Sequence, residues 1–154
     1  QEFEEFPSLA IGAYGDNLLN ITNAYSAINN NGKIQSPEII EKIESFKKQP
    51  IWENKSISKK ILDLKINKKI NKLLEKSVKE GTSKAASIKG KKIYGKTGTS
   101  DGNKDLWFIG SIDNLTTGIW IGYDDNKESE LSSGNAAYLW KKFISEIYKI
   151  PIKK

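Results

Sequence analysis

The chain has 154 residues, of which 37% are apolar, and this suffices for one domain with a hydrophobic core. The absence of cysteine excludes disulfides and thiolate metal sites, and the absence of histidine excludes a Ser-His-Asp triad and a zinc hydrolase. The 25 basic residues outnumber the 19 acidic ones but are spread along the chain, which disfavours sequence-specific binding to nucleic acid. We therefore expect no metal and no cofactor.

Signals for export or membrane insertion are not visible in the sequence. The chain starts with Gln1 instead of Met, shows no signal-peptide pattern, and has no apolar run of membrane-spanning length. We expect residues 1–154 to be a piece of a longer or processed protein. Any export signal or anchor would then lie in a part that precedes Gln1.

The first predicted element is a helix over residues 16–32. Asp16 is a suitable N-cap, and Gly32, after two asparagines, stops the helix. Residues 33–46 carry short β-like apolar runs around a proline, which predicts a strand or hairpin at a sheet edge. Residues 47–60 are rich in lysine and predict a surface connection. The apolar stripe of the helix comprises Leu18, Ile21, Tyr25 and Ile28.

A second amphipathic helix is predicted over residues 67–81, where Gly81 supplies the stop. Its lysines point outward, and we interpret them as a solvated face instead of a binding patch. The predicted apolar face comprises Ile70, Leu73, Leu74, Ser77 and Val78.

Three strands are predicted next, over residues 92–99, 106–112 and 116–123. Turn-forming residues at 101–103 and 113–114 join them, so that neighbouring strands run antiparallel in a meander.

A last helix is predicted within residues 132–150, and Pro151 ends it. Helices packed against an antiparallel sheet indicate the α+β class. The apolar side chains spaced to cover the sheet are Ala136, Leu139, Trp140, Phe143, Ile147 and Ile150.

The tetrapeptide Lys96-Thr97-Gly98-Thr99 ends the first of these strands. Alternation places Lys96 and Gly98 on one face of the strand and the two threonines on the other. A lysine amine, threonine hydroxyls and free strand amides can hold a carboxylate and polarise a carbonyl. Glycine inside a strand often marks close approach by another backbone or a ligand. The alternative interpretation is a polar strand end that leads into a turn at residues 100–102, and the tetrapeptide alone leaves both open.

The tetrapeptide KTGT at 96–99 is followed by DLWFIG at 105–110 and GIWIGYDD at 118–125. In this order the motifs resemble the transpeptidase domain of class A penicillin-binding proteins, which share the fold of the serine β-lactamases. Residues 7–43 and 73–86 are similar to the segments that precede this motif in the family. These linked patterns follow the order of the family and cover nearly the whole chain.

The resemblance implies a partial β-lactamase/transpeptidase-like fold and a role for each residue of the tetrapeptide. Lys96 would orient the catalytic hydroxyls and the carboxylate of the substrate. Thr97 and Thr99 would hydrogen-bond that carboxylate, and the Thr99 amide would be one of two oxyanion-hole donors. Gly98 would let the substrate backbone lie along the strand. The residues expected to be structural are Asp105, Trp107, Trp120 and Asp124.

In the family, the acylating serine of Ser-x-x-Lys and the Ser-x-Asn loop both precede Lys-Thr-Gly. Ser45 and Ser56 begin look-alikes, but they lie too close before Lys96 for the helical part that should separate the motifs. Ser133-Gly134-Asn135 follows Lys96 and is better interpreted as a cap of the last helix. We expect the nucleophile, its lysine and the Ser-x-Asn loop upstream of Gln1, so that the isolated chain neither crosslinks peptidoglycan nor retains a β-lactam.

The sequence thus predicts the C-terminal part of a D-alanyl-D-alanine transpeptidase that crosslinks peptidoglycan through an acyl-serine intermediate. Its expected partners are peptidoglycan stem peptides and β-lactams. Its expected location is the periplasmic side of the bacterial inner membrane, with an anchor outside this chain.

Two alternatives stay open at this point: a non-catalytic binding module of the same fold, and a fragment of a β-lactamase or carboxypeptidase. A sheet that lacks some of its strands should also leave an open edge or an apolar face. Such an edge favours homodimers or strand exchange between chains.

Overall fold

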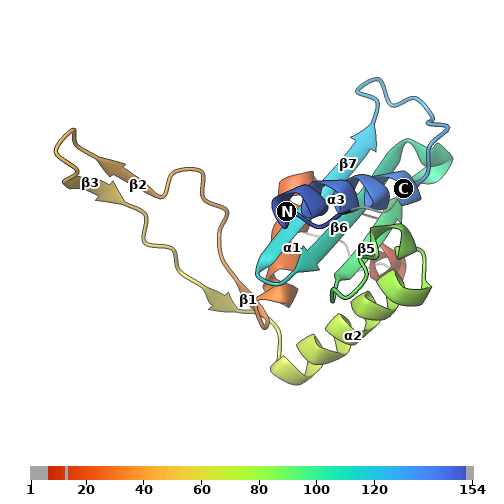
Figure 1. Ribbon diagram of the computed structural model, residues 1–154, viewed down its shortest axis with the longest axis horizontal. Coiled ribbons are helices and arrows are strands. Elements are labelled where there is room, and N and C mark those ends of the chain that lie inside the picture. The colour runs from red at the N-terminus through yellow and green to blue at the C-terminus, as the bar shows by residue number, and fades with distance from the viewer. Residues whose placement is uncertain (1–6, 13, 152–154) are drawn as a thin grey trace.

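The computed structural model describes residues 7–12 and 14–151, and Figure 1 shows their arrangement. Three short 3₁₀ helices, η1 (Pro7–Ile11), η2 (Lys84–Ala86) and η3 (Asp101–Asn103), accompany the main elements. In chain order, the α-helices and strands are α1 (Leu18–Asn29), β1 (Lys33–Ile34), β2 (Lys42–Glu44), β3 (Pro50–Glu53), β4 (Lys59–Lys60), α2 (Leu64–Glu80), β5 (Tyr94–Thr99), β6 (Asp105–Ile112), β7 (Leu115–Gly122) and α3 (Ser133–Ile147).

The central sheet is the predicted meander, with strand order β5-β6-β7 and both pairs antiparallel. The observed strands begin or end within two residues of the predicted ones. Gly102, at a φ of 68°, and Asp113, at a φ of 50°, take the left-handed conformation in the two connections. The α+β class is therefore confirmed.

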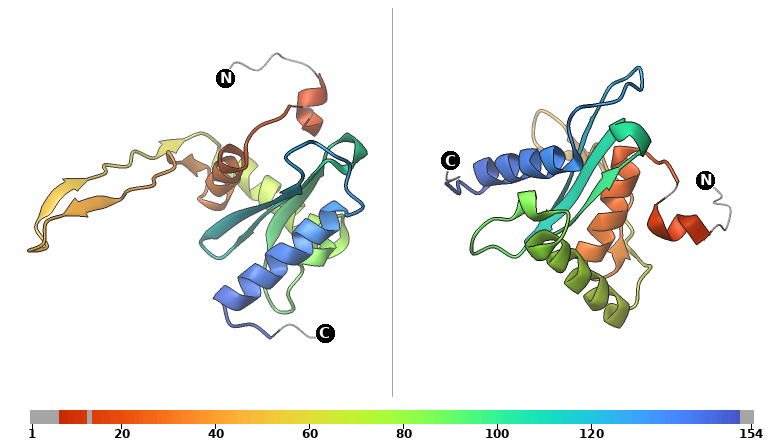
Figure 2. Two further views of the ribbon diagram at one scale, coloured as in Figure 1. Left: turned by 90° about the horizontal axis from the view of Figure 1, so that it is seen from above. Right: turned by 90° about the vertical axis from the view of Figure 1, so that its right-hand side faces the viewer.

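The helices α1 and α3 cover opposite faces of this sheet, while α2 lies alongside β5 (Figure 2). A Cβ atom at Gly118 of β7 would meet Thr22 of α1. Gly110 of β6 pairs with Thr117, the residue before Gly118 on β7. A Cβ atom at Gly110 would instead meet Trp140 of α3. Because neighbouring residues of a strand point to opposite faces, the two helices flank the sheet.

The core lies between the sheet and α3. Phe108 and Trp140 are fully buried and meet edge to face, with ring centroids 5.2 Å apart. Gly95 and Gly110 leave room for these rings, because a Cβ atom at either position would come within 2.6 Å of Phe108. The other buried members of this cluster are Val78, Ala86, Ile88, Ile93, Ile112, Ala136, Ala137 and Ile144.

Two helix starts differ from the predicted ones. Asn17, not Asp16, is the N-cap of α1, because its side chain accepts the hydrogen bond from the Asn20 amide. The Asp16 carboxylate instead accepts from the Asn20 side chain. Helix α2 begins at Leu64, three residues before the predicted start, because the side chain of Asp63 already caps it.

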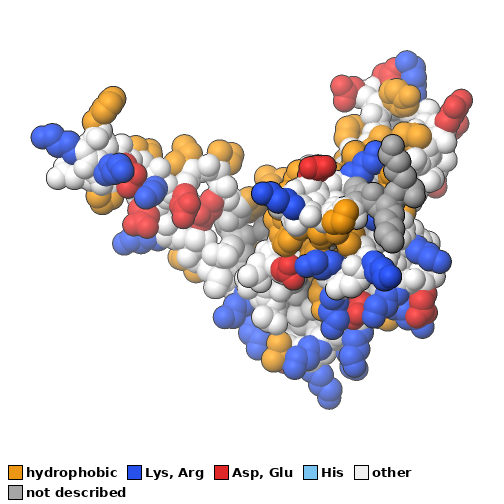
Figure 3. All heavy atoms as spheres, in the orientation of Figure 1, with side chains coloured by type: hydrophobic (Ala, Val, Ile, Leu, Met, Phe, Trp, Pro, Cys, Tyr) orange, Lys and Arg blue, Asp and Glu red, His pale blue; other side chains and the backbone are white. Residues whose placement is uncertain are grey.

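The apolar face of α2 was predicted wrongly at one position. Leu73 is 68% exposed, whereas Asn67 is buried. The face that packs on the body follows Asn67, Leu74 and Val78, and Leu73 lies outside that row. The lysines of α2 point to solvent, as predicted, and form the blue band along the lower side of Figure 3.

The prediction that the last helix covers the sheet holds for one stripe of α3 only. Ala136 and Trp140 are fully buried. The neighbouring stripe of Leu139, Phe143 and Ile147 is exposed by 46%, 47% and 50%. This second stripe has no partner among the described residues that would bury it.

Residues 33–61 form an arm that projects from the body (Figure 1). The predicted strand or hairpin at 33–46 does contain strands, but they do not lie at the edge of the central sheet. They pair with residues 47–60, which were predicted as a surface connection, as β1 with β4 and β2 with β3. Neither pair joins the central sheet. Large apolar side chains along the arm stay in solvent, and Phe46 at its tip is fully exposed. None of the helices in the described ranges is long and apolar enough to cross a membrane.

Candidate functional site

The tetrapeptide at 96–99 lies on β5, an outer strand of the central sheet. Lys96 and Thr99 are exposed, Gly98 is half-buried and Thr97 is 7% exposed. The site is therefore an accessible strand edge and not a segment enclosed in the core.

The direction of the backbone amides of β5 follows from two hydrogen bonds. The Thr97 amide donates to the Ser83 hydroxyl at 3.2 Å, on the side away from β6. The Ser100 amide donates to the Asp105 carbonyl at 3.1 Å, on the side of β6. Because amides alternate along a strand, the Thr99 amide faces the outer edge, on the same side as the Thr97 amide.

The Lys96 ammonium group lies along this outer edge. It donates to the Thr97 carbonyl at 2.8 Å, and the hydroxyls of Thr97 and Thr82 each lie 3.4 Å away. No salt bridge to Lys96 is found within the described residues. The positive charge of Lys96 is thus not paired with a carboxylate of these residues, and its ammonium group can bind an anionic ligand.

Hydroxyl groups behind β5 were missed by reasoning from the sequence. The Thr97 hydroxyl donates to the Thr82 hydroxyl at 2.9 Å. The Ser77 hydroxyl donates to that of Ser83 at 2.9 Å, and Ser83 is fully buried. The only available signal was the Gly-Thr turn at 81–82, which the resemblance included without assigning it a contact.

Gly98 has a structural neighbour in Trp107. A Cβ atom at Gly98 would lie 3.2 Å from the Trp107 Cβ atom on the adjacent strand β6. The close packing of Trp107 therefore gives a reason for glycine at position 98 that does not depend on a ligand.

Asp105 has the structural position that was expected. One oxygen of its carboxylate accepts from the Trp120 indole at 2.9 Å, and the other accepts from the Ser100 hydroxyl at 2.9 Å. Asp105 thereby links β7 to the turn that follows the tetrapeptide. Trp107 is half-buried and faces Gly98 and Trp120 across the strands, while Asp124 is exposed after the end of β7.

The three serine look-alikes do not approach Lys96. Ser45 lies in the turn between β2 and β3 of the arm, where its hydroxyl accepts from the Gln49 amide. The Ser56 hydroxyl accepts from the Gln35 side chain, also in the arm. Ser133 is the first residue of α3, and the Asn135 side chain accepts from the Ser132 amide, as expected of a helix cap.

The serines that do lie near β5 lack the chemistry of a nucleophile. Ser77, Ser83, Ser100 and Ser111 are held by hydrogen bonds, and the residue three positions later is glutamate, alanine or asparagine instead of lysine. In the described part of the chain, no cluster of acidic residues could hold a metal ion.

Two ion pairs involve Glu75 of α2, one within the helix and one to the segment before β5. Lys79 donates to Glu75 at 2.7 Å, and Lys92, just before β5, lies 4.0 Å from the other oxygen of Glu75. The hydrogen bond from Lys79 holds the pKa of Glu75 below its ordinary value.

Comparison with known proteins identifies the family. A family model described as "Penicillin binding protein transpeptidase domain" matches residues 4–143. Penicillin-binding protein 4 of Bacillus subtilis is 30% identical over 143 residues, which is 90% of this chain and 23% of that protein. Penicillin-binding protein 1A of Aquifex aeolicus is 34% identical over 120 residues, which is 78% of this chain and 16% of that protein.

A solved structure supports the same fold. The penicillin-binding protein PonA1 of Mycobacterium tuberculosis superposes with a TM-score of 0.80 at 18% identity, over 96% of this chain and 42% of that one. The chain thus spans about a fifth of the length of the two sequence relatives. It belongs to the penicillin-binding protein transpeptidase family, and its relatives are class A penicillin-binding proteins.

Proposed function

We propose that this chain supplies the substrate-binding edge of a D-alanyl-D-alanine transpeptidase that crosslinks peptidoglycan. One observation carries the proposal: β5 presents an exposed lysine and an outward amide at Thr99 on the same accessible edge. A peptide that ends in a carboxylate can pair with such an edge as an added strand. The positive charge of Lys96 then lies where that carboxylate would end.

Each residue of the edge has a role in this proposal. The Thr99 amide donates to the oxyanion that forms at the scissile carbonyl, and the Thr99 hydroxyl and Lys96 hold the carboxylate. The Thr97 hydroxyl is engaged with Thr82, so we assign it the positioning of Lys96 in addition to any contact with the substrate. Gly98 keeps that part of the strand free of a side chain.

The acylating serine belongs to a part of the protein outside residues 1–154. Its hydroxyl oxygen attacks the carbonyl carbon of the penultimate D-alanine, the peptide bond breaks, and D-alanine leaves with the proton on its amine. The amine of a second stem peptide then attacks the ester and frees the serine. We expect the isolated chain to be inactive, because Ser45 and Ser56 are its only serines with a lysine three residues later and both lie in the arm.

The proposal places the protein outside the cytoplasm, where stem peptides are found, with a membrane anchor in another part of the protein. β-lactams bind the same edge, because they carry a carboxylate beside a reactive carbonyl. Self-association of the isolated chain through a sheet edge stays a prediction for concentrated solutions, and light scattering tests it.

Two other functions compete with this one. A non-catalytic binding module would keep the edge without any acylation, and a β-lactamase or carboxypeptidase would pass the acyl group to water. Neither is favoured by a contact in the structure. The class A relatives favour transfer to an amine.

Labelling with a fluorescent penicillin tests the proposal. The isolated chain and the longest protein encoded in frame with it are incubated with the probe and separated under denaturing conditions. We expect a covalent label on the longer protein only. A label on neither form supports the binding module, and rapid release of the label by water supports the hydrolase.

A further inference from the structure

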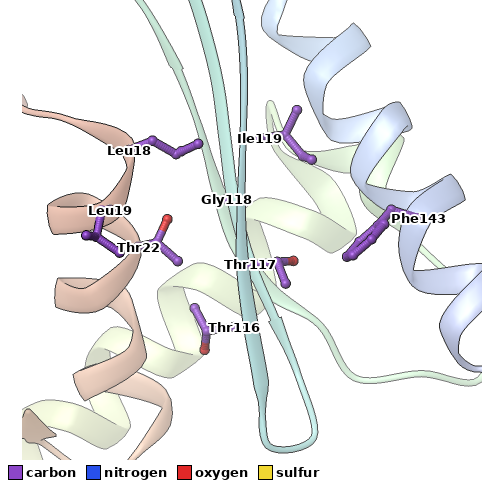
Figure 4. Close-up of a pocket in the computed structure, with 8 residues that line it drawn as sticks. All are labelled: Leu18, Leu19, Thr22, Thr116, Thr117, Gly118, Ile119 and Phe143. Atoms are coloured by element: carbon purple, nitrogen blue, oxygen red, sulfur yellow. The ribbon is translucent and has the colours of Figure 1, made fainter. Parts of the chain in front are cut away.

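Two regions of the described structure leave several large apolar side chains exposed. One is a groove of about 520 Å³ along β7, between α1 and α3 (Figure 4), and Leu19 of α1 and Phe143 of α3 are among the residues that line it. The other is the arm of residues 33–61, which projects from the body (Figure 1). No residue of the arm is buried, so its apolar side chains face water over its whole length.

The far end of the arm is an ordered turn. The Ser45 amide donates to the Gln49 carbonyl at 2.8 Å, and the Lys48 amide donates to the Ser45 carbonyl at 2.9 Å. The Gln49 amide also donates to the Ser45 hydroxyl at 3.2 Å. These bonds close a β-turn whose two central residues are Phe46 and Lys47. The turn therefore presents both side chains outward without any partner.

The apolar side chains next to this turn are also exposed. We call residues 43–52 the arm tip. Phe46 is fully exposed, Ile51 is 67% exposed, and the cross-strand pair of Ile43 and Trp52 is exposed by 45% and 46%. The pair of β2 and β3 joins no other strand, and a hairpin of two strands is at best marginally stable in water. A surface that covers the apolar side chains of the tip would stabilise it.

The arm tip carries unpaired positive charge beside its exposed aromatic side chain. Lys47 and Lys48 directly follow Phe46, and no salt bridge to either lysine is found in the part of the chain that the structure describes. The acidic residue of the tip, Glu44, pairs with Lys42 at 3.0 Å. Figure 3 shows lysine and apolar side chains together at the far end of the arm. The charge of the tip is thus complementary to an anionic surface.

We propose that the arm tip binds the surface of a lipid bilayer that contains anionic lipids. Phe46 enters the boundary between the headgroups and the acyl chains, and the two lysines contact lipid phosphates. Trp52 lies at the level of the headgroups, where the amphipathic indole ring is favoured. The inference goes beyond the proposed function and does not depend on it, because no residue of β5 takes part.

The dimensions of the arm tip fit a bilayer interface. Strand residues rise by about 3.4 Å each, so the pair of Ile43 and Trp52 lies about 10 Å behind Phe46. Segments that lie in the interface bury their apolar side chains about 5–10 Å deep. Glu44 lies between these two levels, and its ion pair with Lys42 lowers the cost of bringing it near lipid phosphates.

A protein partner fits the arm tip less well. A stable protein interface uses about 20–30 residues on each side, whereas the tip offers ten residues on a projecting turn. A bilayer requires no complementary shape. Because a single short turn inserts few apolar side chains, we expect weak and reversible binding that orients the protein at the membrane.

Vesicle binding by the chain of residues 1–154 tests the proposal without any β-lactam. Sucrose-loaded vesicles contain either phosphatidylcholine alone or equal parts of phosphatidylcholine and phosphatidylglycerol, and the bound chain is measured by sedimentation in 0.15 M salt. We expect binding at least about tenfold stronger to the anionic vesicles. Tryptophan emission should shift to the blue on binding, and Trp52→Phe should abolish this shift because the other tryptophans belong to the body.

Variants of the tip separate insertion from attraction by net charge. Phe46→Ser leaves the charge unchanged and should weaken binding to anionic vesicles by at least about fivefold. Lys47→Gln combined with Lys48→Asn should do the same. Asparagine is chosen because Lys48 has a φ of 57°, which asparagine tolerates well. The three side chains are exposed, so the fold should not change.

The matched control removes two charges from another surface. Lys68→Gln combined with Lys69→Gln changes two exposed lysines of α2, which lies on the body and away from the arm tip (Figure 1). Charges that stay farther from the membrane than the Debye length of about 8 Å are largely screened. We therefore expect this pair of substitutions to weaken binding by less than about twofold.

Four outcomes would overturn the proposal. The chain could bind both kinds of vesicle equally, or Phe46→Ser could leave binding unchanged. The α2 pair could weaken binding as much as the tip pair, which would show attraction by the net charge of the whole chain. Finally, the chain could bind neither kind of lipid vesicle, which would assign the exposed tip to a protein partner instead.

Discussion

The two edges of the central sheet differ in chemistry although both belong to the same meander. The outer edge of β5 is bordered by hydroxyls and an ammonium group. The Ser83 hydroxyl accepts a hydrogen bond from the Thr97 amide, and the Lys96 ammonium group donates to the Thr97 carbonyl. The outer edge of β7 is bordered by apolar helix walls, and two buried hydroxyls beside it, of Thr22 and Thr117, have no hydrogen-bond partner among the described residues. A polar edge with outward donors suits a small, charged peptide end that binds and leaves. An apolar edge suits a permanent partner strand.

The comparison also separates two kinds of unfilled surface. At β5 the Thr97 amide donates to the Ser83 hydroxyl, and the Thr97 hydroxyl donates to the Thr82 hydroxyl. These groups therefore have hydrogen-bond partners without any ligand. At β7 nothing within the described residues satisfies Thr22 or Thr117. The two edges therefore differ in how far the described chain satisfies the polar groups beside them.

The largest expected effect is on acylation. If Lys96 has the proposed role, Lys96→Ala in the longer protein should slow penicillin acylation by about 100-fold or more, because a charge that would stabilise the acyl-transfer transition state is removed. Thermal stability should change little, since Lys96 is exposed. Lys89→Ala, at another exposed lysine before β5, is the control and should leave the acylation rate unchanged. Equal acylation rates for both variants would contradict a role of Lys96 in acylation.

At the β7 edge, Gly118→Ala should destabilise the chain by about 1–3 kcal/mol, because the new methyl group forces α1 away from the sheet. Urea denaturation measures the change. Gly15→Ala is the matched control, since a Cβ atom there meets nothing within 4 Å, and its effect should be near zero. A tolerated Gly118→Ala would mean that α1 does not lie against β7.

At the β5 edge, Ser83→Ala should cost about 1–3 kcal/mol, because the buried Thr97 amide and the Ser77 hydroxyl both lose their acceptor. Ser77→Ala should cost less, since the Ser83 hydroxyl still accepts from Thr97. Denaturant midpoints of the two variants test this order. The reverse order would show that Ser83 does not support the strand.

The smallest expected effect is on the stability of the fold at low pH. The lowered pKa of Glu75 means that the folded chain favours its carboxylate, so this contribution to stability is present above the ordinary pKa of about 4.5 and is lost as pH falls through the lower folded value. Glu75→Gln should remove about 0.5 kcal/mol or less at neutral pH and reduce the loss of stability on acidification. The control is Glu146→Gln, at an exposed glutamate of α3, and both variants are compared in thermal melts from pH 3 to 7. A variant that loses as much stability in acid as the parent would exclude Glu75.

Much of the fold could be predicted where local patterns and packing agree. The strands β5 to β7 alternate and are separated by clear turn residues, so their order and pairing followed from sequence alone. The arm could not be predicted, because β2 and β3 are short, lie outside any core and leave Ile43 and Trp52 half in solvent. Leu139 and Phe143 have the spacing of buried residues, but nothing in the described chain covers them.

The role of Lys96 to Thr99 in a site stays a prediction, but their place at the end of a strand could be predicted. The motif resemblance pointed to those four residues, and the structure places them on an accessible edge. Thr82 and Ser83 lie 14 to 15 residues before their partners and come from the turn after α2, so only the fold brings their hydroxyls to β5. Sequence spacing carries no record of that contact.

The most direct test of the central claim is to locate the acylated residue. The longest protein in frame is treated with penicillin, digested, and the adduct is assigned by peptide mass spectrometry. We predict that the adduct lies on a serine outside residues 1–154 and that Lys96→Ala strongly reduces its yield. An adduct on Ser45, Ser56, Ser133 or any other serine within the chain would contradict the account.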